Sequence, residues 1–278
     1  MRLWVHHKLY STLPFTLAHP AAVLPLRRWL VFSALVVGSM APDFHYFIYM
    51  GPDAEASHSL PGVFLFFLPA GLLVLWIFHR FLKLPLISLA PARHAEKLMA
   101  FAGPFPFTPL PRLLLIVASM LAGTLTHLLW DSFTHSGGWF VQRFDFLQTV
   151  VLPQIFFGRS IFSVLQHGST LLGMTVLVVW YAIWFRKAPS QPLPSDMSLS
   201  SATKRWAGIL MILMACALSS GYGWVLFVKY DRFPAFVGGF AIAIITVMFA
   251  EAVVFSLWWW RRRRTYQSLN SGRLSGSG

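Results

Sequence analysis

The sequence predicts an all-α, polytopic integral membrane protein with five to six transmembrane helices. Hydrophobic residues make up 56% of its 278 residues and charged residues only 11%, whereas about 25% of the residues in a soluble domain are charged. Several apolar stretches approach or exceed the ~20 residues that an α-helix needs to cross a bilayer. Most basic residues behind the net charge of +13 flank these stretches, as topology signals do. We therefore expect no nucleic-acid partner.

Five stretches are long and apolar enough to be predicted spans, at residues 61–78, 113–131, 162–185, 206–228 and 236–260. Residues 30–40 are also apolar but shorter than a bilayer crossing requires. This segment ends before Pro42 and Asp43. Two alternatives follow for it, a short tilted span or a buried, re-entrant helix.

Lysine and arginine set the expected orientation, because cytoplasmic loops carry an excess of both. The basic run at residues 261–264 predicts a cytoplasmic C-terminus, and the basic connections at 80–112 and 186–205 then fall on the same side. The segments at 53–58, 133–160 and 229–234 fall on the outer side.

Composition also suggests four parts. Residues 1–187 form a helical membrane domain that holds all ten histidines and would carry the metal site, and residues 188–203 are a linker rich in proline and serine. Residues 204–264 form a C-terminal pair of spans. Residues 265–278 are polar and predict a disordered tail.

His127 and Asp131 lie inside an apolar stretch, and His135 follows four residues later. Residues four apart share one face of a helix, and ionisable groups at membrane depth usually have a function. On the expected topology, further candidate ligands gather at the same outer depth. The full set is Asp43, His58, His127, Asp131, His135 and His167.

Histidine and aspartate side chains are ligands for zinc, manganese or iron, so this set predicts a site for a divalent metal. The alternative without a metal ion is a buried polar network in which Asp131 pairs with a histidine. His19 joins the set if residues 30–40 are re-entrant, but lies on the other side of the membrane if they span. The re-entrant alternative would leave Arg27 and Arg28 outside, against the charge rule.

Five sequence blocks resemble an uncharacterised bacterial membrane family, domain of unknown function 4184. They lie at residues 14–25, 38–43, 58–62, 123–135 and 166–170. The resemblance covers most of the chain up to about residue 185. That family in turn resembles membrane-bound metal-dependent hydrolases, with their His, Pro-Asp, His-Ser and His-x-x-x-Asp blocks. More distantly, the block order is similar to that of zinc-dependent phospholipase C, a helical enzyme with three zinc ions.

The resemblance implies roles for individual residues. His19 would match the ligand nearest the N-terminus. A first zinc site would use Asp43, His58, His127 and Asp131, with Asp131 bridging, and a second would use His135 and His167. The phospholipase pattern ends in His-x-x-x-Glu, whereas Leu171 stands at that spacing after His167. This departure implies either that one site is incomplete or that the protein holds two ions rather than three.

The resulting hypothesis is a hydrolase embedded in the bacterial plasma membrane. It would cleave a phosphodiester or another ester of a membrane lipid or lipid-linked substrate, with Asp131 and Asp43 as catalytic carboxylates and a metal-activated water as nucleophile. Arg143 or Arg159 would contact a substrate phosphate. The simpler interpretation is that these arginines anchor the protein at the membrane interface. An ion transporter or channel that uses the His/Asp cluster, and a non-catalytic membrane scaffold, are the alternatives.

Overall fold

The computed structural model describes residues 16–50, 63–151 and 159–275, with side chains described up to residue 267. Within these ranges the chain is helical, apart from connecting segments and an isolated bridge between Val150 and Ser160. The predicted all-α class is confirmed. Helical segments in this part of the chain that are long and apolar enough to cross a membrane are Phe64–Leu89, Leu110–Arg143, Ile161–Lys187, Ser195–Tyr230 and Phe233–Gln267. The chain is therefore a multi-pass membrane protein.

The helices group into two compact units. The first comprises Met1–Leu75 and Pro106–Ala182, and the second Trp76–Phe105 and Ile183–Gly278. Residues 76–105, which are predicted from composition to belong with the rest of residues 1–187, are part of the second unit. The candidate ligands that the structure describes all lie in the first unit.

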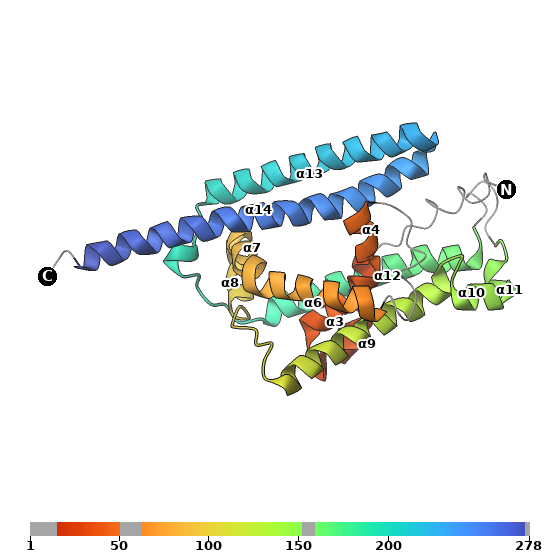
Figure 1. Cartoon of the computed structure of the whole chain (residues 1–278), viewed down its shortest axis with the longest axis horizontal. Coiled ribbons are helices and arrows are strands. Elements are labelled where there is room, and N and C mark those ends of the chain that lie inside the picture. Colours follow the sequence, from red (N-terminus) through yellow and green to blue (C-terminus); the bar gives the residue numbers. More distant parts are fainter. Residues whose placement is uncertain (1–15, 51–62, 152–158, 276–278) are drawn as a thin grey trace. The chain divides into compact units, whose positions relative to one another are not determined.

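The first unit begins with short helices and continues with long ones (Figure 1). The short elements are η1 (Thr16–Ala18), α2 (Pro20–Val23), η2 (Leu24–Arg28), α3 (Phe32–Met40), η3 (Ala41–Asp43) and α4 (Phe44–Tyr49). The later elements are η4 (Val63–Phe67), α6 (Leu68–Ile77), α9 (Leu110–Thr134), α10 (Trp139–Arg143), α11 (Asp145–Gln148) and α12 (Ile161–Lys187).

Helix α3 packs along α9 at a distance that only glycine permits. A Cβ on Gly38 would collide with the carbonyl oxygen of Met120, and a Cβ on Gly123 would collide with that of Leu35. The close approach lets the Thr124 hydroxyl donate a hydrogen bond of 3.1 Å to the Gly38 carbonyl. Small residues at such positions let helix backbones come together in membrane proteins.

The N-terminal elements fold as a hairpin against α9. His19 lies beside Asp131, Val31 beside Ser119, and Ser39 beside His127. The chain therefore descends about twelve residues of α9, or about 18 Å, and then returns along α3. At the turn, the Val31 amide donates to the Ser119 hydroxyl at 2.9 Å, which satisfies a backbone group in an apolar setting.

This hairpin decides between the two alternatives for residues 30–40. Helix α3 has nine residues, about 14 Å of helix, which is less than half of the ~30 Å hydrocarbon core. The structure therefore favours the re-entrant alternative. Arg27 and Arg28 lie near the turn, away from the His/Asp end, and the Arg27 guanidinium lies 5.9 Å from the Trp180 ring. The charge conflict disappears because the arginines and His19 lie at opposite ends of the hairpin.

The second unit is built on a pair of long helices, α13 (Ser201–Tyr230) and α14 (Phe233–Ser275), which lie side by side (Figure 1). Its other elements are η5 (Phe78–Leu82), α7 (Lys83–Leu89), α8 (Ala92–Met99) and η7 (Ser195–Met197). Gly223 packs against Phe236, and Gly239 against Leu226. Helix α14 continues to Ser275, into the segment whose polar composition predicts a disordered tail.

Replacing Gly123 with alanine should destabilise the protein by about 1–3 kcal/mol, because the added methyl group overpacks a backbone contact. Gly168→Ala is the matched control, since a Cβ on Gly168 would meet no atom within 4 Å. The control should be neutral or slightly stabilising because alanine is the better helix former. Unfolding in mixed micelles, followed by circular dichroism, measures both. Equal stability of the two variants would contradict the close α3–α9 contact.

Candidate metal centre

Helix α9 supplies two of the candidate ligands from its last turns, and the residue that follows it supplies a third. His127 and Asp131 are buried on the helix, and α9 ends at Thr134, so His135 is the first residue beyond it. The His135 amide still donates to the Asp131 carbonyl at 3.0 Å. The i, i+4 spacing read from the sequence thus brings the three side chains together.

His127 is fully buried and held in one orientation. Its Nδ1 lies 2.8 Å from the carbonyl oxygen of Ser39. A carbonyl oxygen only accepts, so Nδ1 carries the proton and donates. The Nε2 atom then faces two carboxylate oxygens, Asp131 Oδ2 at 3.0 Å and Asp43 Oδ1 at 3.6 Å.

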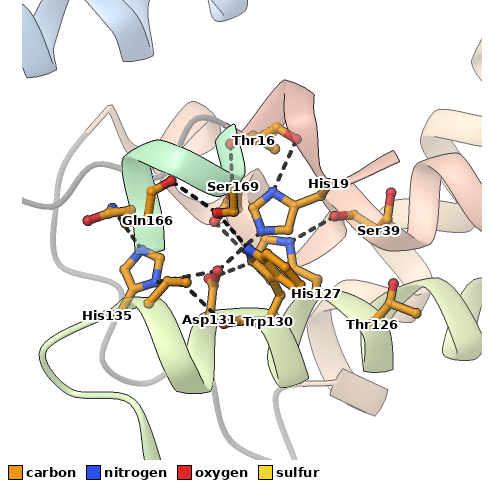
Figure 2. A network of polar contacts seen from close by, with 12 residues as sticks. Thr16, His19, Ser39, Thr126, His127, Trp130, Asp131, His135, Gln166 and Ser169 are labelled. Atoms are coloured by element: carbon orange, nitrogen blue, oxygen red, sulfur yellow. Dashed lines mark hydrogen bonds and ion pairs between the residues drawn. The ribbon is translucent and has the colours of Figure 1, made fainter. Parts of the chain in front are cut away.

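His19 repeats this arrangement next to His127 (Figure 2). Its Nδ1 lies 3.3 Å from the Thr16 carbonyl, and its Nε2 lies 3.2 Å from Asp131 Oδ1. The two imidazole rings stack with centroids 4.0 Å apart. Each oxygen of the Asp131 carboxylate therefore faces the Nε2 atom of one histidine.

Asp43 completes the polar cluster. It is fully buried, and the Thr16 hydroxyl donates to its Oδ2 atom. Among the described residues, Asp43 Oδ1 and His127 Nε2 are buried without a hydrogen-bond partner. Buried polar atoms are normally paired, so these two atoms point to a missing group between them.

A cation satisfies this arrangement. A neutral imidazole presents a lone pair at Nε2, and lone pairs facing carboxylate oxygens repel unless a proton or a metal ion lies between them. In the described part of the chain, ligand atoms of His19, His127 and Asp131 lie within 4.8 Å of one another. Ligand atoms about 2.0–2.2 Å from a zinc ion lie no more than about 4.4 Å apart, so this group is close to the spacing that one ion requires.

The other predicted ligands differ in their position. His135 Nδ1 lies 3.4 Å from Asp131 Oδ1, at the edge of the cluster. His167 is exposed on α12, whereas its neighbour Gln166 is buried. The Gln166 Nε2 atom lies 3.5 Å from His135 Nε2. His58 lies outside the described residues.

The two candidate phosphate ligands make other contacts. The Arg143 guanidinium lies 5.0 Å from the Trp139 ring on the exposed side of α10. Arg159 Nη1 donates to the Ser163 hydroxyl at 3.4 Å. The Arg143 contact fits the simpler reading of an interface anchor.

Tyr46 on α4 also lies near the carboxylates. Burial, together with the charges of Asp43 and Asp131, raises the pKa of its phenol. The hydroxyl therefore stays protonated and remains a hydrogen-bond donor.

A cavity of about 210 Å³ adjoins the cluster. His19, Asp131, His135 and Gln166 line one part of it, and α2 and α12 continue its wall. The Trp130 indole donates to the Ser169 hydroxyl at 3.1 Å beside it (Figure 2). The centre is therefore reached through a defined space rather than closed on all sides.

Sequence reasoning missed Thr16, Ser39 and Gln166. Ser39 acts through its backbone carbonyl, which residue type does not reveal. The position of Gln166 could have been predicted from the sequence. Ser163, Gln166 and Thr170 recur at helical spacing and form a polar face. His167 lies about 100° further around the helix and therefore outside that face.

Comparison with known proteins gives one match. A family model described as "Domain of unknown function (DUF4184)" matches residues 13–257, well over half of the chain. Neither the curated proteins nor the solved structures contain a match.

A disulfide tests the placement of the N-terminal hairpin against α12. A Cβ on Gly173 would lie 3.2 Å from the Ala18 Cβ, near the range that a disulfide needs. In a Cys216→Ser background, which removes the native cysteine, Ala18→Cys/Gly173→Cys should cross-link on mild oxidation. Mass spectrometry of proteolytic peptides measures the bond. The pair Ala18→Cys/Gly168→Cys should stay reduced, and equal cross-linking of both pairs would contradict the hairpin placement.

Proposed function

The chain belongs to the family described as domain of unknown function DUF4184, and we propose that it is a membrane-embedded metal-dependent hydrolase. One divalent cation is held by His19, His127 and Asp131, with Asp43 beside it. The substrate is a phosphodiester or another ester of a membrane lipid or lipid-linked molecule.

One observation supports the metal most strongly. Both histidines use Nδ1 to donate to a backbone carbonyl and turn Nε2 toward the same carboxylate. Metal-binding histidines typically tie their second nitrogen in this way, which fixes the tautomer and orients the ring. A purely structural ion pair with Asp131 needs only one imidazolium. It does not account for the second, stacked imidazole.

The ligand chemistry favours zinc, with manganese or iron as the other candidates. Imidazole and carboxylate ligands suit all three metals. Among the described residues, the group that could hold an ion consists of two imidazoles and a carboxylate, with no thiolate. A site with three protein ligands keeps a position open for water or substrate, as catalytic zinc sites do.

The steps of ester hydrolysis are assigned to the bound ion and to individual side chains. A bound divalent ion polarises an ester or phosphoryl oxygen and makes water a nucleophile at neutral pH. Asp131 fixes the two histidines relative to each other. Asp43 Oδ1 has no hydrogen-bond partner in the described chain, and we assign it to accept the proton of an attacking water. The protonated Tyr46 hydroxyl is a candidate donor to a leaving oxygen.

The setting of the site favours a lipid substrate. His127 and Asp131 lie within the membrane-spanning segment Leu110–Arg143, so a substrate reaches them by diffusing in the bilayer. We place the protein in the bacterial plasma membrane with a cytoplasmic C-terminus, on the basis of the basic residues at 261–264. The resemblance to membrane-bound hydrolases agrees with this proposal.

Metal content tests the site. Elemental mass spectrometry of detergent-purified protein should find one zinc or manganese ion per chain, and a higher count would support the two or three ions that the resemblance implies. His127→Ala and Asp131→Asn should lose the ion, because even outer-shell partners contribute about 10–100-fold to affinity. His167→Ala is the control and should keep it. Full occupancy in Asp131→Asn, or an empty wild type after metal add-back, would favour the transporter or scaffold alternatives.

Hydrolysis tests the activity. Purified protein should cleave phosphatidyl lipids in mixed micelles, lose this activity with a chelator, and regain it with zinc. Asp131→Asn and Asp43→Asn should each lose at least about 100-fold in rate, the usual range for general acid–base groups. Asp145→Asn changes an exposed carboxylate in the same unit and should leave the rate unchanged. A metal-loaded protein without activity on any phosphodiester or ester lipid would contradict the hydrolase.

A further inference from the structure

The cavity beside the metal centre continues away from it between α2 and α12. We propose that this extension holds the apolar chain of a lipid phosphoester whose head group lies at the His19–Asp131 end. The inference rests on the proposed function and names the substrate class of the same site.

The wall of the cavity has two chemically different parts. His19, Asp131, His135 and Gln166 form the polar part, and Ala21, Ala22, Leu172, Gly173 and Val176 form the apolar part. Along α12 the wall runs from Ser169 to Val176, seven residues or about 10 Å. A molecule that fills the cavity is therefore polar at one end and hydrocarbon along its length.

Small side chains create the apolar extension. A Cβ on Gly173 would lie 3.0 Å from the Ala18 carbonyl oxygen, so glycine lets α12 come close to the N-terminal hairpin. Ala21 and Ala22 then leave room where larger side chains would close the space. A hydrocarbon chain fits this narrow, apolar passage and a hydrated head group does not.

The surroundings of the extension set what can enter it. It is lined by α12, within the membrane-spanning segment Ile161–Lys187, where Leu171 and Leu172 are 72% and 62% exposed. In a bilayer these side chains contact acyl chains, so the entering group at this depth is hydrocarbon. A water-soluble ester would have to pass the same apolar surface.

The polar end offers recognition for the head group. Gln166 is 6% exposed and lines the cavity, and its Oε1 atom has no hydrogen-bond partner among the described residues. An unpaired buried acceptor is costly. A hydroxyl of the lipid head group beside the phosphate would satisfy it.

Blocking the extension gives the test. Val176→Trp fills the cavity from α12, and Val178→Trp is the matched control, because Val178 is exposed on the same helix but does not line the cavity. The probe is a phosphatidylglycerol that carries a photoactivatable diazirine in its acyl chain, in nanodiscs. Mass spectrometry maps the labelled residues.

In wild type and in Val178→Trp, labelling should concentrate on Ala21, Ala22 and the Leu172–Val176 turn. It should fall about tenfold in Val176→Trp, equivalent to losing the burial of about two methylene groups. Equal labelling in Val176→Trp and Val178→Trp would overturn the proposal.

Labelling of Asp131→Asn separates this inference from the proposed function. The variant should lose hydrolysis but keep labelling at the extension, since the apolar wall is unchanged. If the wild type labels there without hydrolysing any lipid, the hydrolase proposal fails and the lipid site stands. If it hydrolyses a water-soluble phosphodiester and labels only at random positions, the hydrolase stands and the lipid site fails.

Discussion

The geometry of the centre depends on the close backbone contact between α3 and α9. Gly38 and Gly123 remove the side chains that would separate the helices. As a result, the Ser39 carbonyl reaches His127 Nδ1 and fixes which nitrogen faces Asp131. A separation larger by one methyl group would leave the imidazole without its acceptor and free to turn. Packing between two apolar helices thus sets the chemistry of a polar site.

Thr16 and Ser39 contribute to the same result through atoms that are easily overlooked. Their backbone carbonyls each accept from one imidazole, and the Thr16 hydroxyl donates to Asp43. The candidate ligands are therefore oriented by hydrogen bonds from their neighbours, while Asp43 Oδ1 and His127 Nε2 have no hydrogen-bond partner in the described chain. This contrast between satisfied outer hydrogen bonds and unsatisfied inner atoms is the observation behind the proposed metal site.

The all-α membrane class and the His127–Asp131 pair were predictable, because hydrophobic length and i, i+4 spacing are local properties. The position of His19 was not, since it depends on a hairpin held by contacts about 88 to 112 residues apart. The sequence left two alternatives for residues 30–40, and neither placed the arginines at the turn of a hairpin. His167 was predicted as a ligand because of its residue type. The position on the helix instead favours Gln166, which was not predicted.

The hairpin has a consequence for how the chain is made. Synthesis produces the N-terminal segment first, yet the Val31 amide finds its acceptor on Ser119 and His19 finds Asp131 only on α9. Until α9 is in the membrane, the hairpin carries an unsatisfied backbone group and two arginines that oppose burial. The hairpin segment is translated before α9 and reaches its place only after it, so the His/Asp end of this unit assembles late in biogenesis.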